Sequence, residues 1–173
     1  MSGTQGGKTL NIVEQARNFA IQHHGEQRYG DQPYAYHLDA VVSLLKPYGD
    51  VAQVIGYLHD VVEDTAVTVE QIETKFGSLV AGAVGILSDQ PGADRKERKL
   101  KTYALMAEVT GELEIALLVK TADRLANVQA CGDHGRTDKL NMYQQEHPTF
   151  RQAVFRKGLC DDLWERLDGL VRS

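Results

Sequence analysis

The segment His59-Asp60-Val61-Val62-Glu63-Asp64-Thr65 decides how the fold of this chain is interpreted. It follows an apolar run, so we expect it to continue an α-helix. Glu63 then lies one turn beyond His59. Asp64 likewise lies one turn beyond Asp60. A face with one imidazole and three carboxylates favours a divalent cation beside a catalytic acid or base, because burying ionisable groups is costly unless they are paired or coordinated.

The remainder of the sequence is also helical in pattern. Apolar residues between positions 8 and 24 recur with a period close to 3.6. Segment 25–33 is expected to be a loop, and no segment shows the alternation typical of a strand. Segment 113–128 is apolar on most faces, so we expect it to run through the core. Further helices are expected at 34–46, 50–64, 68–77, 78–87, 94–109, 136–155 and 158–171.

These patterns predict an all-α fold. We expect a single helical domain at residues 8–173, preceded by a flexible tail at residues 1–7. A length of 173 residues is enough to bury one core. A hydrophobic content of 42% and a charged content of 25% are ordinary for a globular protein and exclude a chain that is disordered throughout.

Composition also excludes several kinds of partner. The net charge of −5 argues against a broad nucleic-acid-binding surface. No apolar run approaches the ~20 residues that a membrane-spanning helix needs. The two cysteines, Cys131 and Cys160, are too few for a disulfide framework. We therefore expect a cytoplasmic protein that binds neither nucleic acid nor membranes, and the sequence leaves its oligomeric state open.

Two residues distant in sequence extend the possible metal site. His37 opens an expected helix, and Asp123 directly follows an apolar run on the expected core helix. The pair His59-Asp60 would be a weak signal by itself, since adjacent His and Asp often occur by chance on surfaces. Two imidazoles and two carboxylates together suit Mn²⁺, Fe²⁺, Co²⁺, Ni²⁺ or Zn²⁺ better than Mg²⁺ or Ca²⁺.

Four motifs in a fixed order resemble a known family. Arg28 precedes Pro-Tyr-Ala-Tyr-His at 33–37, then comes the segment 59–65, and then Lys-Thr-Ala-Asp-Arg-Leu-Ala-Asn at 120–127. This order is similar to that of the HD-domain metal-dependent phosphohydrolases. Within them it resembles the hydrolase domain of RelA/SpoT-type enzymes and the small stand-alone alarmone hydrolases of the MESH1 type. The similarity spans roughly residues 10–155.

The resemblance implies roles for the residues of the central segment. Glu63 and Asp64 match the acidic pair that positions or activates the attacking water, and which of them takes the proton stays open. An alternative is that Glu63 is merely solvated at a helix end while Asp64 caps the next turn. The family's usual metal is Mn²⁺. The metal ligands that the resemblance implies are His37, His59, Asp60 and Asp123.

Other residues are candidates for substrate binding. Arg28 and Tyr29 lie in the expected loop, where a guanidinium and an aromatic ring suit a purine base. Asn127 lies one turn past Asp123, and the resemblance makes it a substrate contact, although it also fits an ordinary residue at the end of a helix. Lys120 suits either a phosphate or an ion pair with Asp123.

Basic residues further along the chain complete the candidates. Segment 95–99 matches a basic segment that the family places near the substrate pyrophosphate, and Lys96 is our candidate within it, although most such charge runs are solvated. Lys139 is a further candidate phosphate ligand. Two departures from the family pattern are Leu38, where a proline is common, and Tyr57, where a small residue is usual.

The resemblance implies a stand-alone hydrolase that releases pyrophosphate from the 3′ position of (p)ppGpp, giving GDP or GTP. The chain ends soon after the hydrolase region, so hydrolysis without synthesis is expected. One alternative keeps the site but changes the small-molecule nucleotide, as in a phosphatase of NADPH or another nucleotide. Another is a nucleotide sensor without catalysis, which would have no need for the pair Glu63-Asp64.

Overall fold

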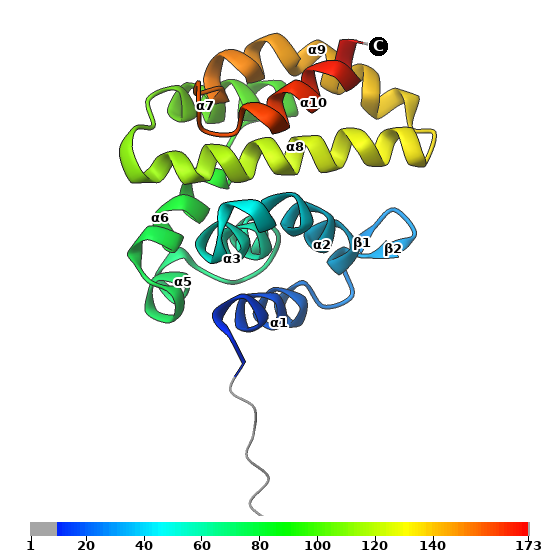
Figure 1. Ribbon diagram of the computed structural model, residues 1–173. Helices are drawn as coiled ribbons and strands as arrows, with labels where there is room; N and C mark the ends of the chain where they lie inside the picture. The colour runs from blue at the N-terminus through cyan, green and yellow to red at the C-terminus, as the bar shows by residue number, and fades with distance from the viewer. Residues whose placement is uncertain (1–9, 173) are drawn as a thin grey trace, which may run out of the picture.

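A computed structural model describes residues 10–172 and is mainly helical, as the sequence predicts (Figure 1). The flexible tail expected at residues 1–7 lies outside the described residues. The α-helices are α1 (Ile12–His24), α2 (Tyr34–Leu45), α3 (Asp50–Leu58), α4 (Val61–Asp64), α5 (Val69–Phe76), α6 (Ser78–Leu87), α7 (Arg95–Ala107), α8 (Ile115–Asp133), α9 (Thr137–Val154) and α10 (Asp161–Arg172). The remaining elements are the 3-10 helices η1 (Lys46–Tyr48) and η2 (Gly111–Glu114) and the strands β1 (Arg28–Tyr29) and β2 (Gln32–Pro33).

Helix α8 lies across the middle of the molecule (Figure 1). Helices α2, α3 and α6 contact it from one side, and α9 and α10 contact it from the other. Residues 116–126 of α8 are all buried, which confirms that this apolar segment runs through the core. No helix within residues 10–172 combines the length and the apolar character needed to cross a membrane.

Capping interactions fix where several helices begin. The Asn11 side chain accepts a hydrogen bond from the backbone N–H of Glu14, and the Glu14 carboxylate accepts one from the backbone N–H of Asn11. Thr68 and Gln71 form the same reciprocal arrangement at α5, as their spacing predicts. These caps satisfy N–H groups that have no partner within the helix.

The loop expected at 25–33 contains a small antiparallel hairpin, so the prediction that no strands occur is wrong here. Arg28 pairs with Pro33 and Tyr29 pairs with Gln32. The connecting residue Gly30 has φ of 61°, a conformation that glycine adopts without steric cost. Strands of two residues leave no periodic signal in a sequence, and for this reason the pattern gave no indication of them.

The helix expected at 50–64 is interrupted at the most informative segment. Helix α3 ends at Leu58 and α4 begins at Val61. His59 and Asp60 lie between them, and Asp60 has φ of −103° and ψ of −4°. The expectation of one continuous helical face is therefore wrong, and the side chains converge because the chain turns between two helices.

The two departures from the family pattern have simple explanations. Leu38 is fully buried within α2, so it fills the core one residue after His37. Tyr57 donates a hydrogen bond from its hydroxyl to Asp39 Oδ1 at 2.9 Å, and Asp39 is also paired with Arg17. Neither Leu38 nor Tyr57 lines the hollow described below.

Candidate metal centre and substrate hollow

Four side chains from separate parts of the chain converge at the interruption between α3 and α4. His37 Nε2 on α2 lies 3.0 Å from Asp123 Oδ1 on α8. His59 Nε2 lies 3.0 Å from Asp60 Oδ2 and 3.4 Å from Asp123 Oδ1. Potential ligand atoms of His37, His59 and Asp60 lie within 4.8 Å of one another. The structure thus brings together all four of the ligands that the sequence suggests.

The surroundings of His59 fit a metal ion. Its Nδ1 lies 2.6 Å from the carbonyl oxygen of Gly56, so Nδ1 carries a proton and donates it there. Its Nε2 is buried and has no hydrogen-bond partner among the described residues. An imidazole held in this way directs a free lone pair at the carboxylates, which is the arrangement of a metal-ligating histidine. The donor set therefore fits a divalent cation.

The electrostatics of the cluster lead to the same conclusion. Burial opposes ionisation of Asp123, but Lys120, His59 and His37 outweigh it and hold the pKa of Asp123 well below its usual range. Burial likewise opposes protonation of His59, but Asp60 and Asp123 raise the pKa of His59 well above its usual value. The carboxylates thus stay ionised and attract positive charge to Nε2, whether a proton or a metal ion.

Neighbouring side chains orient the two carboxylates. The Tyr34 hydroxyl donates to Asp60 Oδ2. Asn127 Nδ2 donates to Asp123 Oδ1 at 3.0 Å, and Lys120 Nζ donates to Asp123 Oδ2 at 3.3 Å. Of the two interpretations of Lys120, the structure therefore shows the ion pair with Asp123. These contacts leave the carboxylates little freedom to rotate.

Glu63 and Asp64 line the same hollow as His37, Asp60 and Asp123, three of the four candidate ligands. Both lie on α4, directly after the turn that carries His59 and Asp60. Partial desolvation, together with the charges of Asp89 and Asp60, raises the pKa of Glu63 above its usual value. A carboxylate with a raised pKa is better suited to accept a proton near neutral pH than an ordinary one.

The hollow has a volume of about 260 Å³ and is lined by a basic wall as well as by acidic residues. Helix α7 contributes Arg95, Arg98 and Lys99 to this wall. Lys96 is exposed and lines a different hollow, with Leu100 among its neighbours. The basic segment 95–99 therefore reaches the first hollow through Arg95, Arg98 and Lys99, whereas the candidate Lys96 does not line it.

Two carboxylates that the sequence did not single out hold this basic wall. Both Oδ atoms of Asp89 accept hydrogen bonds from Lys99 Nζ, at 2.8 and 2.7 Å. Glu146 on α9 accepts from Arg95 Nε at 2.8 Å and lies 3.1 Å from Arg124 Nη2. No local pattern distinguishes these acids from solvated ones, because their partners lie on other elements.

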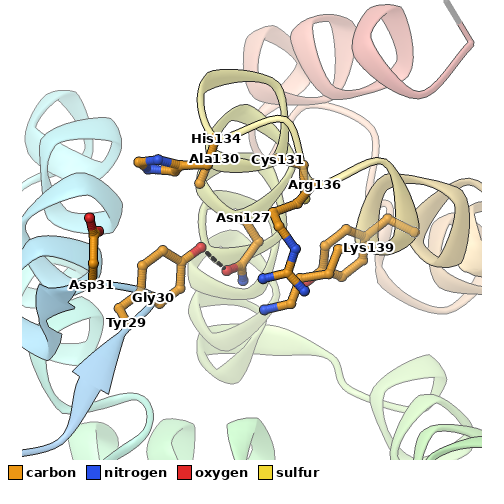
Figure 2. Close-up of a pocket in the computed structure, with 10 residues that line it drawn as sticks. Tyr29, Gly30, Asp31, Asn127, Ala130, Cys131, His134, Arg136 and Lys139 are labelled. Carbon is orange, nitrogen blue, oxygen red and sulfur yellow. Dashed lines mark hydrogen bonds between the residues drawn. The ribbon is translucent and has the colours of Figure 1, made fainter.

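A second hollow of about 310 Å³ adjoins the first and shares Tyr29, Asn127 and Tyr143 with it (Figure 2). The Tyr29 hydroxyl donates to Asn127 Oδ1 at 2.7 Å, shown as a dashed line in Figure 2. Lys139 and Arg136 provide positive charge on its other side (Figure 2). Tyr29 and Asn127 thus lie where the two hollows meet.

Tyr29 and Arg28 differ in what they contact. The Tyr29 ring stacks on the His37 ring with centroids 4.6 Å apart and an interplanar angle of 12°. Arg28 instead donates from Nη2 to the carbonyl oxygen of Asp31 at 2.9 Å, which secures the hairpin turn. Arg28 lines neither hollow, so the structure separates these two candidate base contacts.

Two histidines outside the set of candidate ligands are also buried. His24 at the end of α1 is 6% exposed, and its Nδ1 lies 2.8 Å from Gln27 Oε1. His147 on α9 is 8% exposed, and its Nε2 lies 2.7 Å from Asp168 Oδ1. Neither histidine is marked as buried by its neighbours in sequence, because the groups that cover it lie on other elements.

A helical domain that gathers two histidines and two aspartates around a buried, unpartnered imidazole nitrogen defines a class of metal-binding all-α proteins. The HD domain family matches residues 16–151, and the chain belongs to this family. The expectation of an HD-domain helical bundle is thereby confirmed, as is the need of this family for a divalent metal.

Individual relatives agree with this assignment. A probable guanosine-3′,5′-bis(diphosphate) 3′-pyrophosphohydrolase of Synechocystis is 33% identical over 164 residues, which cover 91% of this chain and 21% of the relative. The guanosine-3′,5′-bis(diphosphate) 3′-pyrophosphohydrolase MESH1 of Danio rerio is 34% identical over 125 residues, or 68% of each chain. The chain thus spans about a fifth of the length of the Synechocystis relative.

A solved structure shows the same fold. It is that of a metazoan ortholog of SpoT that hydrolyzes ppGpp, and it matches with a TM-score of 0.80 at 24% identity. The match covers 96% of this chain and 97% of the other. The arrangement of helices around α8 is therefore shared over almost the whole chain.

Proposed function

We propose that this protein is a metal-dependent hydrolase that releases pyrophosphate from the 3′ position of (p)ppGpp, giving GDP or GTP. The observation that carries the proposal is the unpartnered Nε2 of His59, which lies beside the carboxylates of Asp60 and Asp123. Those two carboxylates line a hollow together with the acidic pair and a basic wall. The relatives from Synechocystis and Danio rerio are named as guanosine-3′,5′-bis(diphosphate) 3′-pyrophosphohydrolases, which supports the same substrate.

For the ion we propose Mn²⁺, with another divalent transition metal as the alternative. Mixed nitrogen and oxygen ligation favours such ions over Mg²⁺ and Ca²⁺. When bound, the ion supplies a Lewis acid that lowers the pKa of water and offsets phosphate charge. The residues that we propose to hold it are His37, His59, Asp60 and Asp123.

The protein's own side chains would orient water and move its proton. We propose Glu63 as the proton acceptor, because its raised pKa brings it closer to neutral pH. Asp64, which lines the hollow beside it, would orient the attacking water. The acidic pair also argues against a sensor without catalysis, since a carboxylate beside an anion-binding wall weakens the binding of phosphate.

The two hollows suggest how a nucleotide is divided between them. Arg95, Arg98 and Lys99 would bind the pyrophosphate, because they form the basic wall of the hollow that Glu63 and Asp64 also line. The second hollow would take the nucleoside, with Tyr29, Asn127 and Lys139 as its proposed contacts. In this arrangement Arg28 acts indirectly, by securing the hairpin that carries Tyr29.

Residues 8–173 are proposed to act as one hydrolase unit on a small-molecule nucleotide. The two cysteines are unpaired and buried, which supports a reducing cytoplasmic setting. Nucleic acid and membrane surfaces are not among the proposed partners, since the net charge is −5.

The test is incubation of the purified protein and Mn²⁺ with ppGpp and, in parallel, with NADPH. Chromatography is expected to show GDP and pyrophosphate from ppGpp. The variant with both Glu63→Gln and Asp64→Asn should lose turnover while still binding Mn²⁺. Release of phosphate from NADPH with no product from ppGpp would replace the proposed substrate, and full activity of the double variant on ppGpp would contradict the proposed mechanism.

A further inference from the structure

A chain of hydrogen bonds joins a buried histidine to the acidic pair. Gln27 Nε2 donates to Asp64 Oδ2 at 2.9 Å. Gln27 Oε1 lies 2.8 Å from His24 Nδ1. Gln27 lines neither of the two hollows, so its side chain acts on the site through Asp64.

The direction of each hydrogen bond is determined by chemistry. The carboxylate of Asp64 accepts, so the neighbouring Gln27 group must be the NH₂ that donates. The other end of the Gln27 amide is then its carbonyl oxygen, which accepts a hydrogen bond from Nδ1–H of His24. His24 Nε2 is buried without a hydrogen-bond partner among the described residues. His24 is therefore constrained as the Nδ1–H tautomer, and it fixes which way the Gln27 amide points.

His24 is itself held in place by packing. Its ring lies 4.5 Å from the ring of Tyr34, measured between centroids, and the Tyr34 hydroxyl donates to Asp60. The same ring is only 6% exposed. The hydrogen-bond chain therefore starts from a buried group whose neighbour Tyr34 contacts the candidate ligand Asp60.

Asp64 needs such support because of its position. It is the last residue of α4, a helix of four residues that follows the interruption at His59 and Asp60. So short a helix leaves the direction of its final side chain weakly defined by backbone packing. A charge-assisted hydrogen bond from a neighbouring element removes that freedom.

We propose that Gln27 is a positioning residue that fixes the direction of the Asp64 carboxylate in the first hollow, and that His24 fixes Gln27 in turn. The role of Asp64 rests on the proposed hydrolase function. The hydrogen-bond chain itself does not, so the two can be tested separately.

The first test is Gln27→Leu, assayed with Mn²⁺ and ppGpp. We expect kcat to fall by about 10- to 100-fold, the range expected when a reacting group is displaced by about 1 Å. KM should change less than threefold, because Gln27 contacts neither hollow. Gln22→Leu, the same substitution at an exposed position on α1, is the matched control and should leave both constants unchanged. A rise in KM with unchanged kcat would overturn the proposal.

A double-mutant cycle then separates positioning from general damage. In the Asp64→Asn background, Gln27→Leu should cause less than a twofold further loss of kcat, because the group that it positions no longer works. If the losses of the two single variants instead multiply, Gln27 acts through another residue and the proposal fails.

The third test does not depend on activity. Nitrogen-15 NMR of the wild-type protein should show His24 protonated at Nδ1, and Gln27→Leu should abolish that fixed tautomer. His24→Phe removes the Nδ1–H that fixes Gln27, so it should lower kcat at least fivefold. It keeps a ring against Tyr34 and removes the unpartnered Nε2, so the midpoint of thermal unfolding should not fall. An Nε2-protonated His24 would refute the hydrogen-bond chain. Absence of ppGpp hydrolysis by wild-type protein with an Nδ1-protonated His24 would instead refute only the proposed function.

Discussion

Gly56 accepts a hydrogen bond from the imidazole of His59, and the same glycine lets α3 lie close to α2. A Cβ atom added at Gly56 would lie 2.7 Å from Leu45 Cδ1 and 3.1 Å from Val42 Cγ2. The residue whose carbonyl fixes the tautomer of His59 thus also sets the distance between two core helices. Metal-site geometry and core packing are therefore linked at one position.

Gly56→Ala should destabilise the protein by about 1–3 kcal/mol, the usual cost of overpacking, because Leu45 is fully buried and has little room to move. It should also weaken Mn²⁺ binding, since His59 directly follows α3. Urea unfolding and metal titration measure the two effects. Gly85→Ala on α6 is the control: nothing lies near its added Cβ, so a gain of about 0.5–1 kcal/mol is expected. Equal effects of the two substitutions would contradict the link.

Mn²⁺ should raise the thermal stability of the protein. At a concentration 100 times its dissociation constant, a ligand that binds only the native state stabilises by about 2.7 kcal/mol. For a chain of this size that corresponds to a rise of about 5–10 °C in the unfolding midpoint. His59→Ala should abolish the rise, whereas His23→Ala, at an exposed histidine, should preserve it. Scanning calorimetry with and without a chelator provides the measurement.

The stability that Asp39 contributes should depend on pH. The hydrogen bond from Arg17, and that from Tyr57, hold the pKa of Asp39 below its usual value despite partial burial. A carboxyl whose pKa is lower in the folded state stabilises above its unfolded pKa, about 3.9, and that stability disappears as pH falls through the folded pKa. The unfolding free energy of wild type should exceed that of Asp39→Asn at pH 7, and the difference should shrink progressively as the pH is lowered below about 3.9. The difference should be small because the Arg17–Asp39 pair is partly exposed.

Two lysines on α7 should differ sharply in their effect on substrate binding. Lys99→Met should raise KM for ppGpp about tenfold, since it removes a charge-assisted contact worth about 1.4 kcal/mol or more from the basic wall. Lys96→Met should change KM less than twofold because Lys96 faces a different hollow. Inhibition by inorganic pyrophosphate should weaken in the same order. The reverse order would show that the sequence-based choice of Lys96 was the better one.

Much of the fold and the convergence of four candidate ligands could be predicted from the sequence. Helical periodicity and capping residues act locally, so α1, α5 and the buried course of α8 follow from nearby residues. The candidate ligands were suggested by the order of short motifs, although they lie on separate elements. The helical periodicity, the capping residues and the motifs can each be recognised from a few neighbouring positions in the sequence.

The features that the sequence did not reveal depend on tertiary packing. Asp89 and Glu146 look like solvated acids until α7 and α9 bring Lys99 and Arg95 to them. Gln27 likewise resembles an ordinary loop residue, because its partner Asp64 is remote in sequence. The interruption of the helix at 59–60 was also missed, since a helix and a turn place nearby side chains on similar faces.

The hairpin formed by β1 and β2 has a consequence for how such a protein can diversify. Gly30 and Asp31 at its tip line the second hollow, whereas the four candidate ligands belong to α2, α8 and the turn before α4. Replacement of the tip would therefore remodel the second hollow, where we propose that the nucleoside binds, without altering the helices that carry the candidate ligands. Under the proposed function, the candidate ligands would stay on the core helices while the hairpin tip, a short surface segment, could change the substrate preference.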